Sequence, residues 1–134
     1  MTETLSKPTE ALARAVRRDV LRMVHRAKAS HVGSCFSVAD ILAVLYGRVM
    51  RVDAADAHAA DRDRFILSKG HAAAALYATL AQVGLIAHAD LSSYGSDLSP
   101  YMTHASHKIN GVEFSSGSLG HGLPFGVGKA LAAK

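Results

Sequence analysis

The amino-acid sequence predicts an α/β protein that is rich in helix and has one or two short parallel strands. Its 134 residues, 49% of them hydrophobic and 19% charged, suffice for one domain with a buried core and are too few for two ordinary domains. Runs of alanine, the absence of tryptophan and only three prolines are typical of a helical protein. One short apolar segment, residues 65–67, has polar neighbours on both sides, as a buried strand has.

The first element is predicted as an amphipathic surface helix that starts at Pro8 or Thr9, with Thr9 as its N-cap, and ends near Lys28. An aliphatic residue recurs every four positions on one side and an arginine every four positions on the other: Leu12, Val16, Val20 and Val24, then Arg14, Arg18, Arg22 and Arg26. A basic stripe can bind nucleic acid or an anionic membrane surface, but neither interleaved aromatic residues nor a second basic cluster accompanies this one. The sequence therefore favours a solvated helix face and no nucleic-acid partner.

The middle of the chain is predicted as two helices joined by a connection and a strand. Ser37-Val38-Ala39-Asp40 resembles a capping box in front of an apolar run, so we expect a helix that follows Ser37 and ends near residues 47–50. Residues 51–63 are rich in aspartate and form an exposed connection. Residues 65–67 then form the strand, and residues 71–83 form a helix that Gly84 caps.

The last third is predicted as a short helix over residues 90–94, a long loop over residues 96–116 and a glycine-punctuated helix over residues 119–134. One clear strand and about five helices cannot cover both faces of a parallel sheet. We therefore expect an open sheet edge and an exposed apolar surface, which another chain completes.

The sequence gives no sign of secretion or of a membrane span. Cys35 is the single cysteine, which excludes an intramolecular disulfide and agrees with a reducing compartment. Uninterrupted apolar stretches fall far short of the roughly 18 residues of a membrane span, and residues 1–7 lack the basic-then-apolar order of a signal peptide. We expect a cytoplasmic protein without a membrane partner.

Histidine and glycine occur together in three places where helical periodicity does not require them: residues 30–33, residues 68–71, and residues 103–107 leading to residues 117–122. A helix starting at Gly117 to Leu119 would direct free backbone N–H groups outward, and Gly117 and Gly120 would let a phosphate approach the backbone. This pattern suits a diphosphate, although glycine clusters also form ordinary turns. A Walker A loop is excluded, because Gly128-Lys129 lacks both the earlier glycine and the following serine or threonine.

The histidines in these segments are candidates for proton exchange near neutral pH. A structural role in a hydrogen-bonded loop is the alternative for each of them. His104 and His107 do not indicate zinc, because neither a cysteine pair nor a His-Glu-x-x-His motif accompanies them. No residue of this chain is predicted as a metal ligand.

Three segments of the chain resemble motifs of the transketolase N-terminal domain, which binds thiamine diphosphate. They are SHVG at residues 30–33, RFILSKGHA at residues 64–72 and GVEFSSGSLGHGL at residues 111–123, in the order and approximate spacing of that family. The resemblance covers residues 12–134 and is close to the split type, whose N- and C-terminal halves are separate chains. It implies the N-terminal portion of the thiamine-diphosphate-binding fold, with the sheet incomplete in this chain.

The resemblance also implies roles for individual histidines. His31 matches a catalytic histidine near the reacting end of the donor sugar, although Val32 and residues 34–36 depart from the usual Pro-Gly-Ala-Pro run. A further catalytic histidine is His104 or His107; His104 keeps the family's seven-residue distance to Gly111, whereas His107 would need a deletion. The residues that match cofactor-binding positions are His71, Gly117, Ser118, Leu119 and Gly120.

The implied activity is transfer of a two-carbon ketol unit from a ketose phosphate to an aldose. Mg²⁺ would hold the diphosphate, but its family ligands, a Gly-Asp-Gly motif and a later asparagine, are absent here, so residues 1–134 are expected to form a partial domain that ends before that motif. Expected partners are a chain carrying Gly-Asp-Gly and a C-terminal subunit with the pyrimidine-binding domain, in a homo- or hetero-oligomer. The chain alone is expected to be inactive; the alternative is a non-catalytic scaffold or regulatory module.

Overall fold

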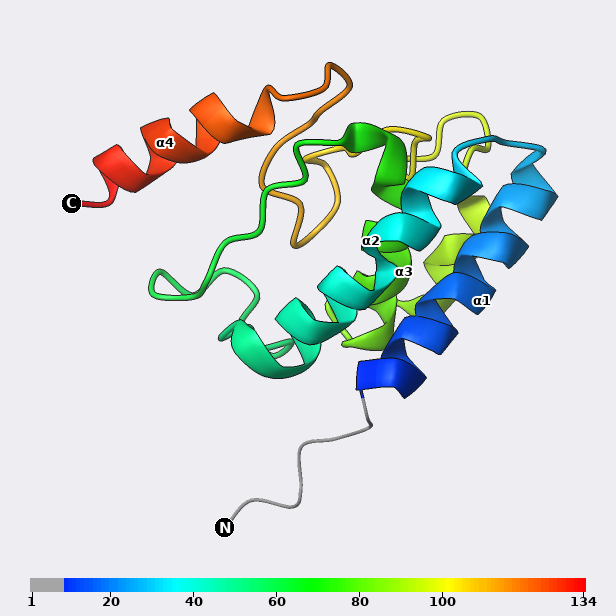
Figure 1. Ribbon diagram of the computed structural model, residues 1–134, viewed down its shortest axis with the longest axis horizontal. Helices are drawn as coiled ribbons and strands as arrows, with labels where there is room; N and C mark the ends of the chain where they lie inside the picture. The colour runs from blue at the N-terminus through cyan, green and yellow to red at the C-terminus, as the bar shows by residue number, and fades with distance from the viewer. Residues whose placement is uncertain (1–8) are drawn as a thin grey trace, which may run out of the picture.

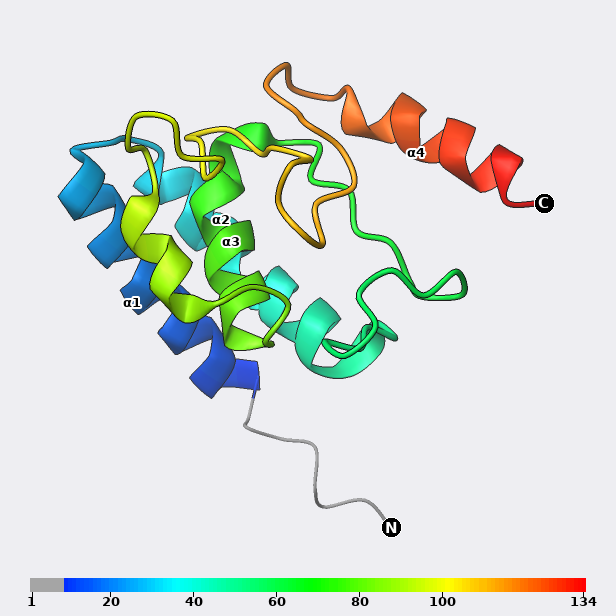
Figure 2. The same cartoon turned by 180° about the vertical axis from the view of Figure 1, so that it is seen from behind.

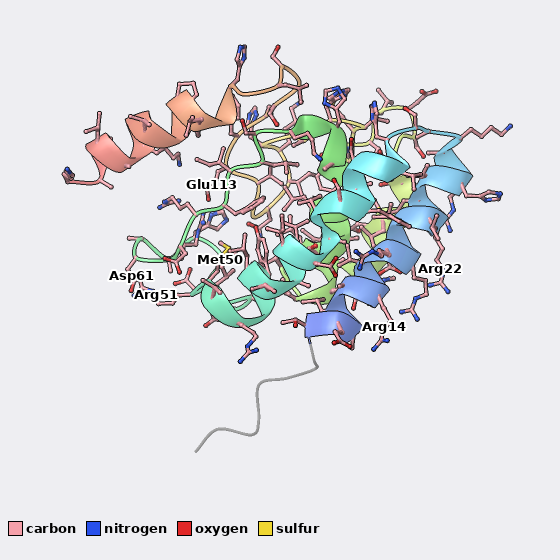
Figure 3. All side chains as sticks on the ribbon, viewed as in Figure 1. Arg14, Arg22, Met50, Arg51, Asp61 and Glu113 are labelled. Carbon is pink, nitrogen blue, oxygen red and sulfur yellow. The ribbon has the colours of Figure 1, made fainter. Side chains whose placement is uncertain are left out.

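The first helix, α1 (Thr9–Ala27), confirms the amphipathic pattern. Val16, Val20 and Met23 are buried against the rest of the protein, whereas Arg14 and Arg22 point outward (Figure 3). The computed structural model describes residues 9–134, so the alternative start at Pro8 and the predictions for residues 1–7 lie outside the described residues.

Three helices form the body of the molecule, with α1 packed on both α2 (Val32–Val44) and α3 (Ala73–Gln82) (Figure 1). Every side chain from residue 73 to residue 81 is buried. The alanines of α3 make this possible, because their small side chains allow close helix packing on all sides. A 3₁₀ turn, η2 (Gly70–Ala72), leads into α3, and Gly84 follows it with a φ of +85°, as predicted for a capping glycine.

A buried carboxylate ties α1 to the elements beside it. Asp19 is 1% exposed, and its Oδ2 accepts a hydrogen bond from Gln82 Nε2 of α3 at 2.7 Å. The same oxygen lies 2.9 Å from His88 Nε2 in η3 (His88–Ser93). η3 is a 3₁₀ helix and corresponds to the short helix predicted over residues 90–94.

The second helix begins at Val32, six residues before the predicted start after Ser37. His31 precedes it in the left-handed conformation, with φ at 75°. Ser37 lies inside the helix, where its hydroxyl donates to the carbonyl of Ser34 at 2.9 Å, and Asp40 accepts from Arg17 of α1. The capping-box interpretation was therefore wrong, because tertiary partners and the preceding turn take up the groups that suggested it.

The second helix ends as predicted. A π-helical turn, η1 (Leu45–Val49), continues α2 and gives way to extended backbone at Met50. The stretch Val32–Val49 has the length and, with a mean hydropathy of 1.5, the composition of a membrane span. Within the fold, α2 packs against α1 and α3, with Cys35, Ala39 and Leu42 buried, but only 22% of the stretch Val32–Val49 is buried.

Residues 65–67 are extended but form no strand within the part of the chain that the structure describes. A strand requires a neighbouring ladder of backbone hydrogen bonds, and among residues 9–134 the only pairing of this kind is an isolated antiparallel bridge between Ala105 and Ser116. Instead, the hydroxyl of Ser116 donates to the carbonyl of Leu67 at 2.7 Å. The predicted one or two parallel strands are therefore not found, and the described residues form helices and loops.

The last helix, α4 (Gly122–Ala132), begins three residues after the predicted start at Leu119 and stands apart from the three-helix body (Figures 1 and 2). A Cβ on Gly122 would lie 2.7 Å from Ser68 Cα, so only glycine allows this approach to the extended segment. The expected exposed apolar surface is present on and before α4, at Leu119, Leu123, Val127 and Leu131, which are 53–73% exposed.

Candidate active site

Three histidine rings from separate parts of the chain meet at one end of the helical body. The ring centroids of His31 and His71 are 4.9 Å apart, those of His71 and His104 are 4.8 Å apart, and those of His31 and His104 are 5.5 Å apart. His31 precedes α2, His71 lies in η2, and His104 lies in the loop that follows η3. We call these three residues the histidine triad.

Local backbone geometry directs two of these rings into the triad. His31 is one of three non-glycine residues among residues 9–134 with positive φ, a conformation that turns the chain sharply at the start of α2. Gly70, just before His71, packs so tightly that a Cβ there would lie 1.9 Å from the carbonyl oxygen of Ser116. Lys69 links the two turns, because its Nζ donates to Ser37 Oγ in the first turns of α2 at 3.0 Å.

Tyr77 of α3 holds the third histidine in place. Its hydroxyl is fully buried, donates to the carbonyl of His104 at 3.0 Å and accepts from the backbone N–H of Ser106 at 3.0 Å. Burial, partly offset by the hydrogen bond from Ser106, raises the pKa of Tyr77 to about 12, so the phenol stays protonated and can keep donating.

The triad is partly desolvated and has unused hydrogen-bonding capacity. Burial lowers the pKa of His104, and the adjacent rings of His71 and His31 lower it further, which favours the neutral imidazole. The Nδ1 atoms of His31 and His71 are buried and have no hydrogen-bond partner among residues 9–134. Buried polar atoms normally have partners, so this arrangement suits a ligand that offers hydrogen-bonding oxygens.

The structure separates the two candidates for the third histidine. His104 lies in the triad, whereas His107 is exposed and its Nδ1 lies 2.6 Å from Ser115 Oγ. The two residues are three positions apart in an extended loop, which directs their side chains to different surroundings. The catalytic role of either histidine stays a prediction.

The glycine-rich turn before α4 also borders the triad, but it is not the start of the helix. A Cβ on Gly117 would lie 3.9 Å from His104 Cδ2, so this residue is next to the triad. The N–H of Gly120 donates to the carbonyl of Ser68 at 3.2 Å, and that of Gly122 donates to Ser68 Oγ at 3.1 Å. Since α4 begins at Gly122, the prediction of a helix N-terminus at Gly117 to Leu119 was wrong.

Among residues 9–134, no group of three or more His, Cys, Asp or Glu side chains is arranged to hold a metal ion. The triad can instead donate and accept hydrogen bonds and exchange protons, because a neutral imidazole has one nitrogen of each kind. Tyr77 and Lys69, which hold the triad, were not predicted from the sequence. In the sequence, Tyr77 cannot be distinguished from any other aromatic residue of the core. Lys69 can be distinguished from a surface lysine only by its position beside Gly70-His71.

The Tyr77→Phe substitution tests how the His104 loop is held. It leaves the buried carbonyl of His104 and the N–H of Ser106 without partners, so we expect a loss of about 1–3 kcal/mol in the free energy of unfolding. The NMR signals of the His104 ring are expected to shift. Tyr94→Phe is the matched control, because Tyr94 is equally buried and its hydroxyl makes no hydrogen bond to residues 9–134. Equal effects of both substitutions would contradict the assigned role of Tyr77.

Comparisons with known proteins show which family this chain is similar to. The family model described as the thiamine diphosphate binding domain of transketolase matches residues 9–134. An apulose-4-phosphate transketolase subunit of Phocaeicola vulgatus is 40% identical over 118 residues, which cover 88% of this chain and 42% of that protein. The transketolase of Homo sapiens is 37% identical over 122 residues, which cover 91% of this chain and 20% of that protein.

A solved structure agrees with the sequence comparisons. The transketolase from Leishmania mexicana superimposes with a TM-score of 0.86 at 34% sequence identity, covering 92% of this chain and 19% of its own. This chain thus spans less than half of the Phocaeicola vulgatus relative and about a fifth of the longer enzymes. Because the family model matches residues 9–134 and the solved transketolase superimposes over 92% of this chain, the chain belongs to the transketolase family and matches its N-terminal, thiamine diphosphate binding domain.

Proposed function

We propose that this chain contributes the histidine triad to the thiamine diphosphate site of a split transketolase. The observation that carries the proposal is the meeting of three imidazoles with two buried Nδ1 atoms that have no partner among residues 9–134. A diphosphate and a hydroxylated sugar both present oxygens to such nitrogens. The residues present therefore fit the cofactor and substrate classes of the family.

In this proposal the three histidines have different roles. His71 would bind a diphosphate oxygen, and Gly117, Ser118, Leu119 and Gly120 would contribute to the cofactor site, with Gly117 next to His104. His31 and His104 orient sugar hydroxyls. Burial and the adjacent rings lower the pKa of His104 and so favour its neutral form, which has a free nitrogen to accept a proton from a hydroxyl. Thiamine diphosphate, when bound, supplies the electron sink for cleavage and formation of the carbon–carbon bond.

The proposed reaction is transfer of a two-carbon ketol unit from a ketose phosphate to an aldose, in the cytoplasm. It requires partners in our proposal, because the similar protein of Phocaeicola vulgatus is named a transketolase subunit. The family's Gly-Asp-Gly motif, which would hold Mg²⁺, does not lie in residues 1–134. We assign that motif and the pyrimidine-binding domain to partner chains in a homo- or hetero-oligomer. The exposed apolar side chains of α4 support such an assembly, because contiguous apolar surface of this kind is rarely left in water.

Calorimetric titration of thiamine diphosphate and Mg²⁺ tests the proposal. The titrant is added to this chain alone and to its mixture with a chain that carries Gly-Asp-Gly and the pyrimidine-binding domain. We expect saturable binding only in the mixture and at least about a tenfold loss of affinity on His71→Ala, as for removal of one charge-assisted or buried hydrogen bond. His121→Ala is the control, because His121 is exposed at the start of α4.

Binding in the mixture that His71→Ala leaves unchanged would contradict the role of the triad. An absence of binding in both samples, with the chain folded, would favour the alternative of a non-catalytic scaffold or regulatory module.

A further inference from the structure

A polar pocket lies beside Glu113 and does not include any member of the histidine triad. It has a volume of about 510 Å³ and is bordered by His58, Arg62, Arg64, His107, Lys108 and Glu113, among others. This volume falls within the range of small-molecule sites, roughly 300–1,000 Å³. We call it the Glu113 pocket.

The pocket has an excess of positive charge. Glu113 has a side chain that is only 5% exposed, and three cationic side chains contact it. Arg62 donates to Oε1, while Arg64 Nη1 and Lys129 Nζ lie 3.3 Å and 2.9 Å from Oε2. One carboxylate cannot neutralise three cations, so the cluster keeps a net positive charge that an anion would balance.

The neighbouring cationic side chains stabilise the ionised form of Glu113. Burial on its own would raise the pKa of this carboxyl, but the hydrogen bonds and charges of Lys129 and Arg62 outweigh that effect and lower it. Figure 3 shows Glu113 between the extended segment that leads to α3 and helix α4, which supply these cations. The Glu113 carboxylate thus holds these cationic side chains close to one another.

Further cationic groups and an unused donor lie at the same place. Lys108 adds a third positive charge to those of Arg62 and Arg64 on the lining, and its own ammonium makes no ion pair with residues 9–134. The Nε of Arg62 is buried and has no hydrogen-bond partner among the described residues. The nearby Asp63 does not line the pocket and pairs with Arg51.

The wall formed by residues 109–113 is rigid before any ligand binds. Ile109 and Val112 are buried, and the N–H of Val112 donates to the carbonyl of Ile109 at 3.1 Å. Asn110 Nδ2 donates to the carbonyl of Leu85 at 3.0 Å, and Gly111 has a φ of +84°. A preformed wall lowers the entropy cost of binding.

We propose that the Glu113 pocket is a binding site for the phosphoryl group of a small molecule, distinct from the proposed cofactor site. Arginine and lysine are the side chains that recognise phosphate oxygens through charge-assisted hydrogen bonds. Inorganic phosphate and a phosphate ester share this chemistry, and the size of the pocket leaves room for the body of an ester. The site does not depend on thiamine diphosphate binding, so its test is independent of the proposed function.

Titration with inorganic phosphate at constant ionic strength, followed by ¹H–¹⁵N NMR of the full chain, tests this site. We expect saturable shifts of the Arg62 Nε–Hε signal and of the backbone amides of residues 107–113. Lys108→Ala is expected to weaken binding about fivefold, as for loss of one exposed charge near the ligand. Arg14→Ala is the charge-matched control, because Arg14 is exposed and lies at the opposite side of the molecule in Figure 3.

A parallel titration with glycerol 3-phosphate distinguishes the two sources of the phosphoryl group. Tighter binding of the ester would support a small phosphorylated metabolite as the ligand, whereas equal or weaker binding would support free phosphate. Shifts that do not saturate, or an equal loss of binding in Lys108→Ala and Arg14→Ala, would overturn the proposal, because both results indicate nonspecific attraction to a basic protein.

Discussion

The Gly70→Ala chain is expected to lose at least about 3 kcal/mol of its free energy of unfolding, since overpacking against backbone lies at the costly end of core substitutions. The added Cβ would lie 1.9 Å from the carbonyl oxygen of Ser116 and 2.6 Å from its carbonyl carbon. Ser116 cannot move away easily, because its hydroxyl donates to Leu67 and its N–H donates to Ala105. The turn that carries His71 must therefore shift.

Chemical denaturation followed by circular dichroism measures this loss. Gly128→Ala is the matched control, because a Cβ there meets no atom within 4 Å and the residue lies inside α4. We expect that control to keep or gain stability, by about 0.5–1 kcal/mol, because alanine is the better helix former. A Gly70→Ala chain as stable as the control would contradict the tight contact between the two loops.

The second large effect is expected for Glu113→Gln. Among residues 9–134, the substitution removes the only negative charge that Arg62, Arg64 and Lys129 contact in common, and it leaves Arg62 largely buried beside two other cations. Removal of one partner from a buried ion pair leaves an uncompensated charge, and we expect a loss of about 3 kcal/mol in the free energy of unfolding. The substitution also removes a shared ion-pair partner that links α4 to the extended segment, because Lys129 lies on α4 and Arg64 lies on that segment.

The pH dependence of this loss identifies its electrostatic origin. The pKa of Glu113 is lower in the folded chain than its ordinary value of 4.5, so its stabilising effect is complete above that pH and disappears as the pH falls through the folded-state pKa. The stabilities of the wild-type and Glu113→Gln chains are therefore expected to converge in acid. Asp40→Asn serves as the control, because Asp40 pairs with Arg17 at the exposed surface, and such pairs add little.

A difference between wild type and Glu113→Gln that persists unchanged well below pH 4 would contradict the ion-pair explanation. It would instead indicate a loss of packing around the substituted side chain.

The parts of the fold that the sequence predicted correctly depend on local patterns. The four-residue spacing of Val16 and Val20 against that of the arginines predicted α1, and the alanine-rich run before Gly84 predicted α3. Such patterns determine which face of a helix is buried whatever lies against it. The sequence also offered His31, His71 and either His104 or His107 as site residues; the rings of His31, His71 and His104 meet, and their roles remain a prediction.

The predictions that failed concern boundaries that depend on distant partners. Ser37 resembles an N-cap, but the left-handed turn at His31 starts α2 earlier. Residues 65–67 have the composition of a strand, yet an extended segment becomes a strand only where a neighbour pairs with it. The start of α4 moves to Gly122, because the Gly120 and Gly122 N–H groups bond to Ser68 instead of remaining free.

The sequence by itself determined the family, the helical core and the histidines, because motif spacing and apolar periodicity are properties of neighbouring residues. Only the tertiary structure decided that His104, and not His107, joins His31 and His71, because loop geometry and the buried hydroxyl of Tyr77 place the ring. It also decided that Glu113 gathers three cations from segments far apart in the chain. Contacts between distant segments depend on packing and backbone turns, which no local pattern encodes.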